Sequence, residues 1–283
     1  MRRRFSPWFT GAAVLLLLAP IVSCGGPEKA IEESLLAHVL FFSNFEKGFE
    51  ALSCAGDDLA TFETSNPPQR QLGGGIVDDC LSFDKEASAL SYAARANFPY
   101  NSRGAWSGAV SFWLSVDPSK ELEANYPEPF HIGKKENNAF SWDDAVIFVD
   151  FTKPPRALRF GCYPNKTREV SDEMVDQRVI RVENLKWKSK EWHHIVITWK
   201  NLNSGRADAE WALFLDGVEK GRKTKLRQDI TWNMEDQVIR FNHYKYAGAI
   251  DEIAIFDKML TPAEAKYLHK PRLPLNALLK KDR

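Results

Sequence analysis

The chain has 283 residues, with 38 Lys and Arg against 38 Asp and Glu, so its formal net charge is zero. This balance excludes the strongly basic composition that attracts nucleic acid, and it does not favour an acidic polymer as ligand. We therefore expect no nucleic acid among its partners. Once residues 1–23 are set aside, the remaining length fits one large all-β domain.

Residues 1–23 have the features of an export signal, because Arg2, Arg3 and Arg4 precede the apolar run GAAVLLLLAPIVS. That run is too short for a membrane-spanning helix. It leads into IVSC at 21–24, which resembles the lipobox of bacterial lipoproteins. The resemblance implies a lipid on Cys24 and an exported protein, anchored to a bacterial membrane and facing the periplasm or the cell surface. An ordinary cleaved signal peptide is the alternative.

Three further cysteines are Cys54, Cys80 and Cys162. In an oxidising compartment we expect a disulfide between Cys54 and Cys80, because both lie in the same early segment, with Cys162 left over. The chain has no CxxC motif and no Cys/His spacing of a zinc site. A cysteine-based metal site is therefore not expected.

After the anchor the pattern changes from helical to β. Residues 27–37 have helical spacing and good helix formers, so 24–36 are expected to be a tether or a short helix. From residue 37 onward, short β-rich runs alternate with Gly, Pro, Asn and Asp, as in a β-sandwich. Strands are predicted at 38–45, 80–84, 89–93, 108–116, 129–133, 145–151, 157–163, 194–199, 209–215, 237–242 and 248–257.

Three local signals refine this pattern. Asp216-Gly217 follows an alternating run and predicts a two-residue hairpin. The polar stretch 164–186 is expected to be a loop or an insertion. Thr261-Pro262-Ala263-Glu264 is a capping box that predicts a short helix to about His269, followed by a C-terminal tail over 271–283.

Three segments carry a family resemblance: GAVSFWLSVDP, EWHHIVITW with WALFLDG, and YAGAIDEIAIFDKMLTPAEAKYL. They resemble laminin-G-like domains of the concanavalin A-like lectin/glucanase superfamily. The resemblance spans roughly residues 37–270 and implies an all-β fold, a two-sheet antiparallel jelly-roll β-sandwich with a short C-terminal helix. Two departures are the long segment 164–186 and the absence of an Asp- and Gly-rich stretch within 49–75.

The adjacent His193 and His194 begin one of these strands. No HxxxH motif and no carboxylate spacing accompanies them, so a metal site is not expected there. We interpret both as packing or capping residues.

The superfamily includes glucanases, which need two carboxylates close together across the sugar. The most acidic strand, IDEIAIFD, places Asp251 and Glu252 on opposite faces, and Asp251 and Asp257 about 20 Å apart. No catalytic residue is therefore predicted. The resemblance does suggest a structural calcium ion at Asp251, with Asn44 or Glu46, because calcium takes several hard oxygen ligands. The alternative is that Asp251 only hydrogen-bonds a neighbouring turn.

Four tryptophans near predicted turns are candidate ligand contacts: Trp106, Trp142, Trp187 and Trp232. A tryptophan there either stacks on a sugar or a partner protein, or fills an end of the core. The sequence thus predicts a non-catalytic, membrane-anchored module that binds a glycan or a protein. A structural or protein-interaction lipoprotein of the cell envelope is the alternative, and a divergent glycoside-active enzyme comes third.

Overall fold

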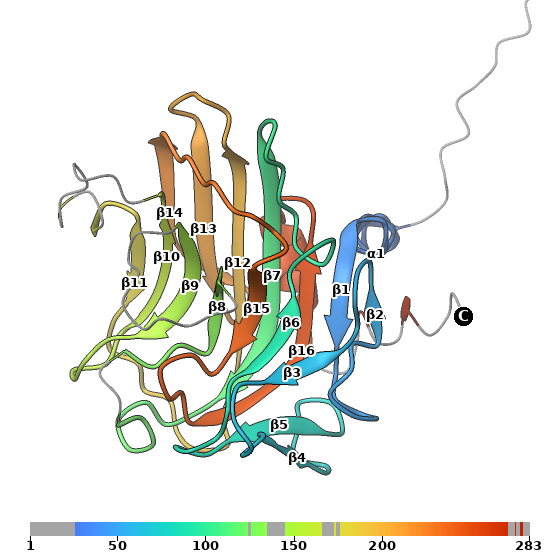
Figure 1. Ribbon diagram of the computed structural model, residues 1–283, viewed down its shortest axis with the longest axis vertical. Coiled ribbons are helices and arrows are strands. Elements are labelled where there is room, and N and C mark those ends of the chain that lie inside the picture. Colours follow the sequence, from blue (N-terminus) through green and yellow to red (C-terminus); the bar gives the residue numbers. More distant parts are fainter. Residues whose placement is uncertain are drawn as a thin grey trace, which may run out of the picture.

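The computed structural model describes residues 26–123, 126–134, 145–165, 173, 176–270, 275 and 278–279. The predicted signal segment, Cys24 and Trp142 lie outside these residues. Within them, two curved antiparallel sheets lie face to face (Figure 1). The all-β jelly-roll sandwich predicted from the sequence is confirmed.

The nine-stranded sheet has the order β14-β13-β12-β7-β16-β1-β2, with β5 paired to β16 and β4 paired to β5. Its strands are β14 (Val218–Leu226), β13 (Ala209–Leu215), β12 (Trp192–Leu202), β7 (Trp106–Ser115), β16 (Gly248–Phe256), β1 (Val39–Ser43), β2 (Ser53–Cys54), β5 (Cys80–Phe83) and β4 (Gln69–Gln71). The seven-stranded sheet has the order β11-β10-β9-β8-β15-β6-β3. Its strands are β11 (Val179–Val182), β10 (Leu158–Tyr163), β9 (Val146–Phe151), β8 (Phe130–Lys134), β15 (Gln237–Phe241), β6 (Leu90–Ala93) and β3 (Ala60–Phe62).

Side-chain alternation places the core between the sheets. In β7, Val110, Phe112 and Leu114 point inward and are fully buried. Phe112 stacks against Phe130 of β8 in the opposite sheet, with ring centroids 6.1 Å apart. Successive residues of a strand face opposite sides, so Ser111, Trp113 and Ser115 lie on the outer face of the nine-stranded sheet.

Apart from β14, which the predicted hairpin implies, four strands were not predicted: β2, β3, β4 and β11. Each is two to four residues long and lies at the end of a strand series. Edge strands are short and polar because an exposed apolar edge would pair with other chains, so they lack the alternation that reveals central strands. The stretch 164–186 therefore contains a strand, β11, besides its loop residues.

Two helices pack together on the outer face of the nine-stranded sheet. α3 (Pro262–Leu268) has the predicted capping box, with both the Thr261 and the Glu264 side chain accepting a backbone N–H of the other residue. α1 (Pro27–His38) buries Leu35 in the same apolar cluster. The Tyr267 hydroxyl donates to Glu32 at 2.6 Å, which ties the two helices together.

The Asp216-Gly217 hairpin forms as predicted, with φ of 52° and 72° at its two turn residues. Positive φ at both positions matches the type I′ geometry that suits the twist of paired strands.

The predicted disulfide is wrong: Cys54, Cys80 and Cys162 are all free thiols. Cys54 pairs with Phe41 of β1, which runs along residues 253–256 of β16, whereas Cys80 lies in β5, which pairs with residues 248–250 at the other end of the same edge. Proximity in sequence did not bring the two thiols together, because β1 and β5 flank opposite parts of β16. In the part of the chain that the structure describes, no helix is long and apolar enough to cross a membrane.

We predict that Thr261→Ala lowers the free energy of unfolding by about 1 kcal/mol, since it removes the N-cap acceptor of α3. Urea denaturation measures this change. Thr231→Ala, at an exposed position outside any helix, is the control and leaves the midpoint nearly unchanged. Equal effects of the two substitutions would show that the cap contributes nothing.

Candidate functional site

A cleft of about 810 Å³ opens on the outer face of the nine-stranded sheet. Its floor is one row of residues in cross-strand register: Trp192 pairs with Ser115, Ser115 with Ala249, and Ala249 with Ser82. Directly paired residues of antiparallel strands point to the same side of the sheet. Three neighbouring small side chains beside one half-buried tryptophan therefore leave a hollow with an aromatic wall.

Gly248 keeps this floor low. A Cβ atom at this position would lie 2.8 Å from the Ser115 carbonyl oxygen, closer than real Cβ contacts, and φ is 156°. Any larger residue here would push β16 away from β7 or strain the backbone.

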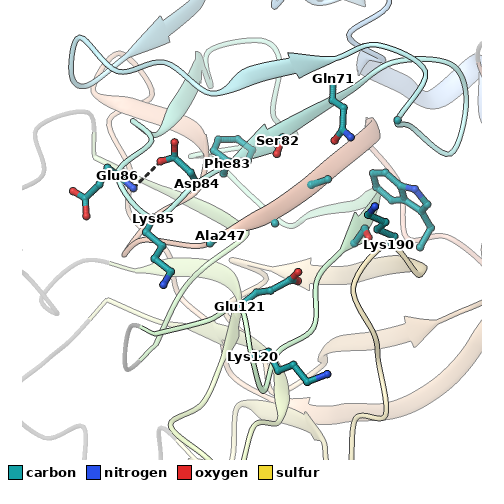
Figure 2. Close-up of a pocket in the computed structure, with 15 residues that line it drawn as sticks. Gln71, Ser82, Phe83, Asp84, Lys85, Glu86, Lys120, Glu121, Lys190 and Ala247 are labelled. Atoms are coloured by element: carbon teal, nitrogen blue, oxygen red, sulfur yellow. Dashed lines mark hydrogen bonds between the residues drawn. The ribbon is translucent and has the colours of Figure 1, made fainter.

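The walls of the cleft are charged loops (Figure 2). In Figure 2, Gln71, Ser82 and Asp84 lie on one side of β16, and Lys120 and Glu121 lie on the other. Three cations and three anions line the cleft: Lys85, Lys120, Lys190, Asp84, Glu86 and Glu121. Their formal charges cancel, so the cleft favours a ligand with little net charge.

Several polar groups of the cleft have no protein partner among the described residues. The hydroxyls of Ser82 and Ser115 make no side-chain hydrogen bond there, and Lys190 forms no ion pair. A hydroxyl both donates and accepts, and an ammonium donates up to three hydrogen bonds. The floor and the Lys190 wall therefore offer hydrogen bonds that a bound molecule can complete.

Two carboxylates fix the walls. Glu121 accepts from the Asp117 backbone N–H at 2.5 Å and from the Ser189 hydroxyl at 2.7 Å, which joins the turn after β7 to the turn before β12. On the opposite side, Asp84 accepts from the Glu86 backbone N–H at 2.8 Å and closes the turn after β5. The carboxylates of Glu121 and Asp84 thus shape the loops.

The Asp251 carboxylate holds the loop that contains Ile76 and Val77. One of its carboxylate oxygens accepts from the backbone N–H groups of Ile76 and Val77, at 3.0 and 3.3 Å, and the other accepts from the Glu252 N–H at 2.8 Å. Burial and the neighbouring Glu252 raise the pKa of Asp251 to about 9, although the backbone donors act in the opposite direction. Asp251 thus hydrogen-bonds a neighbouring turn, which was the alternative to a calcium ligand in the sequence analysis.

These contacts bear on the predicted calcium ligands. Asp251 and Asn44 are buried, and the Glu46 carbonyl oxygen accepts from Arg70 at 2.9 Å. Three backbone N–H donors already surround the Asp251 carboxylate, so these residues as arranged do not fit a calcium site without a shift of the loop 75–77. Calcium at Asp251, Asn44 and Glu46 stays a prediction.

The predicted ligand tryptophans that the structure describes lie in the core. Trp106, Trp187 and Trp232 are 6, 8 and 6 % exposed. Trp106 and Trp232 pack on each other with centroids 5.9 Å apart, and Trp187 meets Phe151 edge to face at 5.8 Å. None of the three presents a ring face to solvent, so they fill the core, which was the stated alternative. Trp142 lies outside the described residues.

The two adjacent histidines pack, as the sequence indicated. His194 is buried on the outer face, packed against both Trp113 and His269, and its Nε2 atom is 2.8 Å from the Ser111 hydroxyl. His193 stacks on Trp187 at 4.2 Å and bonds Asp216 through Nδ1 at 2.9 Å. His269 directly follows α3, so the stack attaches that helix to the sheet.

The comparison with protein families decides the identity of the domain. The Laminin_G_3 family model, described as the concanavalin A-like lectin/glucanases superfamily, matches residues 92–266, more than half of the chain. The chain belongs to this superfamily. No curated protein matches it significantly.

Solved structures of the superfamily fold are similar to this chain at low sequence identity. The binding domain of botulinum neurotoxin serotype D is 12% identical with a TM-score of 0.58, over 84% of this chain and 52% of that one. The same toxin's ligand-binding domain in complex with N-acetylneuraminic acid is 13% identical with a TM-score of 0.56, over 86% and 53%. Domain 4 of a Geobacillus stearothermophilus extracellular arabinanase, in complex with arabinotriose, is 14% identical with a TM-score of 0.50, over 82% and 100%. This chain spans about half the length of the toxin chains.

Sequence reasoning did not select Trp192, which lines the cleft together with the buried Phe83. Trp192 begins the run that was read as a strand, and nothing in the run separates it from core aromatics. The small residues that expose its ring, Ser82, Ser115 and Ala249, come from three other strands. Only the register of the sheet brings them together.

We predict an acid-sensitive stability that depends on His194. Burial, and next the nearby His269, lower the pKa of His194 to about 3 from 6.5. The unfolded chain binds this proton near pH 6.5 and the native protein does not, so this contribution to stability is full above pH 6.5. It is lost as pH falls toward 3, at about 1.4 kcal/mol per pH unit for one proton.

Urea denaturation between pH 7 and pH 4 measures this loss. His194→Gln is expected to lower stability at pH 7 and to make the fall shallower by about one proton. Ser111→Ala is the matched control, because it removes the hydrogen-bond partner and keeps the buried imidazole. An unchanged slope in His194→Gln would mean that His194 does not titrate in this way.

Proposed function

We propose that the protein is a non-catalytic binding module that takes a glycan of little net charge in the cleft beside Trp192. The row of Trp192, Ser115, Ala249 and Ser82 carries this proposal. An indole face packs on the C–H face of a sugar ring, while small neighbours leave room for the ring itself. Free hydroxyls on the floor then meet the hydroxyls of the sugar.

The similar structures support the ligand class. Two of them were solved in complex with a sugar, N-acetylneuraminic acid for the toxin domain and arabinotriose for the arabinanase domain. The first is an acidic sugar and the second a neutral one. The cancelling charges of the present cleft favour the neutral class.

The absence of catalysis is part of the proposal. Glu121 and Asp84, the cleft carboxylates whose contacts are described above, bind backbone N–H groups and a serine hydroxyl of the surrounding turns. A glycosidase needs one carboxyl to donate a proton and a second one to face the same bond. Because Glu121 and Asp84 are engaged in holding turns, their arrangement supports a binding role over a catalytic one.

We also propose that the module is exported and held on a bacterial membrane by a lipid on Cys24, in the periplasm or at the cell surface. IVSC at 21–24 supports this, together with the basic and apolar run before it. α1 begins at Pro27, three residues after the proposed lipid, and packs against α3. The anchor would thus connect to the domain through a docked helix.

We predict that Trp192→Ala weakens glycan binding, measured on an array of neutral polysaccharides and oligosaccharides with calcium and again with a chelator. Loss of the half-buried indole, the more exposed of the two aromatic side chains that line the cleft, is expected to weaken binding at least tenfold, about 1.4 kcal/mol. Ala249→Leu, which fills the floor and leaves Trp192 in place, is expected to have the same effect.

Tyr126→Ala is the matched control, since Tyr126 is an aromatic residue 40% exposed outside this cleft. Binding that persists in Trp192→Ala and is lost in Tyr126→Ala would overturn the cleft assignment. A folded protein that binds no glycan would favour the protein-interaction or envelope role. Binding lost with the chelator, and restored by added calcium alone, would support the predicted calcium ion.

We predict that Cys24→Ala moves the protein from the membrane fraction to the soluble fraction of expressing bacterial cells. The physical reason is loss of the acyl chains, each buried CH₂ of which contributes about 0.8 kcal/mol to membrane binding. Labelling with a radioactive fatty acid, followed by fractionation, measures both steps. Cys54→Ser is the control and keeps label and location. Label retained in Cys24→Ala would disprove the anchor.

A further inference from the structure

Glu128, His131 and His243 lie together at the seven-stranded sheet, on the opposite side of the core from the cleft. Each offers one metal-ligand atom, and these atoms all lie within 4.8 Å of one another. Among the described residues this is the one group of three or more His, Cys, Asp and Glu side chains that converge in this way. The proposed glycan site makes no use of it.

Backbone pairing holds the three residues in place. Glu128 and His243 form an isolated antiparallel bridge, with N–H to carbonyl bonds of 2.8 and 2.9 Å in both directions. The bridge continues the pairing of β8 with β15, in which His131 lies opposite Arg240. Phe130 and Ile132 lie in the core, and successive residues of a strand face opposite sides, so His131 points to the outer face. His131 lies in β8, and the bridge holds the other two residues directly beyond the ends of β8 and β15, which favours a rigid site.

The two imidazoles lie close together and are oriented. Their ring centroids are 4.5 Å apart, and Nδ1 of His131 is 2.7 Å from the Glu128 carboxylate. Nε2 of His131 extends over Gly133, where a Cβ atom would lie 2.4 Å from it. A glycine at this point in β8 therefore gives the imidazole its position. The ring nitrogens of His243 have no hydrogen-bond partner among the described residues.

The charges around the group are compensated. Arg240 lies 2.8 Å from the Glu63 carboxylate, and Arg159 forms a bidentate pair with Asp150. Both guanidinium groups thus have their own carboxylate, and the repulsion that they would exert on a bound cation is reduced. The Glu128 carboxylate then has the His131 imidazole as its side-chain partner.

We propose that Glu128, His131 and His243 bind a divalent transition-metal cation of the zinc type. Two imidazoles and one carboxylate suit zinc, whereas calcium takes oxygen ligands alone. Tetrahedral zinc, with bonds of about 2.0–2.2 Å, holds its ligands about 3.4 Å apart. The His131–Glu128 pair opens slightly and His243 closes to reach this geometry. Three protein ligands leave one coordination position for water or another small ligand.

The protonation states agree with the geometry for the histidines. Burial lowers the pKa of His131 to about 3 and also lowers the pKa of His243, so both imidazoles are neutral at pH 7, as metal ligation requires. Burial raises the pKa of Glu128, so a cation that binds there displaces a proton.

Isothermal titration of the purified, chelator-treated protein with ZnCl₂ tests this site. We expect one zinc per chain, at least tenfold weaker binding in His131→Gln and in His243→Gln, and a rise in melting temperature with zinc in the wild type alone. Circular dichroism establishes that both variants remain folded. Co²⁺ gives a second readout, because its visible absorption reports ligand number and geometry.

Two matched controls address adventitious binding. His38→Gln removes an exposed imidazole that lies 2.6 Å from Asp257, and Cys54→Ser removes the most exposed of the described thiols. Both are expected to bind zinc as the wild type does. The proposal is overturned if the wild type binds no zinc, if folded His131→Gln and His243→Gln both bind it unchanged, or if a control abolishes binding. Glycan binding is independent of every one of these outcomes.

Discussion

The alternation of side chains along β7, paired on one side with β12 and on the other with β16, determines the arrangement of the rest of the domain. Its inward residues fill the core between the sheets. Its outward residues have three separate tasks: Ser111 bonds His194, Trp113 stacks against that histidine and His269, and Ser115 is part of the cleft floor. One central strand therefore contributes to the core, to the surface on which α3 packs and to the candidate site.

The two outer faces of the sandwich differ in how they accommodate polar groups. The nine-stranded sheet leaves small residues under an open cleft, at little cost in desolvation, because its polar groups still reach water. The seven-stranded sheet buries charges such as Asp150 and Arg240, which are stable there only as ion pairs. The aromatic and aliphatic core between the two faces separates them. A ligand in the cleft therefore shares no lining residue with the group at the seven-stranded sheet.

What could be predicted from sequence was local. The alternation of 108–116, the Asp216-Gly217 turn and the capping box at Thr261 each depend on neighbouring residues, and all three formed as expected. The sites depend on register between distant strands. Trp106 and Trp192 both lie at a strand start, yet Trp106 packs in the core between the sheets, whereas Trp192 pairs with Ser115 on the outer face and lines the cleft.

The free thiols have a practical consequence. Cys80 and Cys162 are buried as small apolar residues, and neither they nor Cys54 form a covalent cross-link. Burial also raises the pKa of Cys80 to about 12, which keeps the unreactive thiol form dominant at neutral pH. The described fold therefore requires no oxidant and no disulfide isomerase. Among these three thiols a reducing agent therefore finds no bond to break, and the fold that contains them is held by packing and hydrogen bonds.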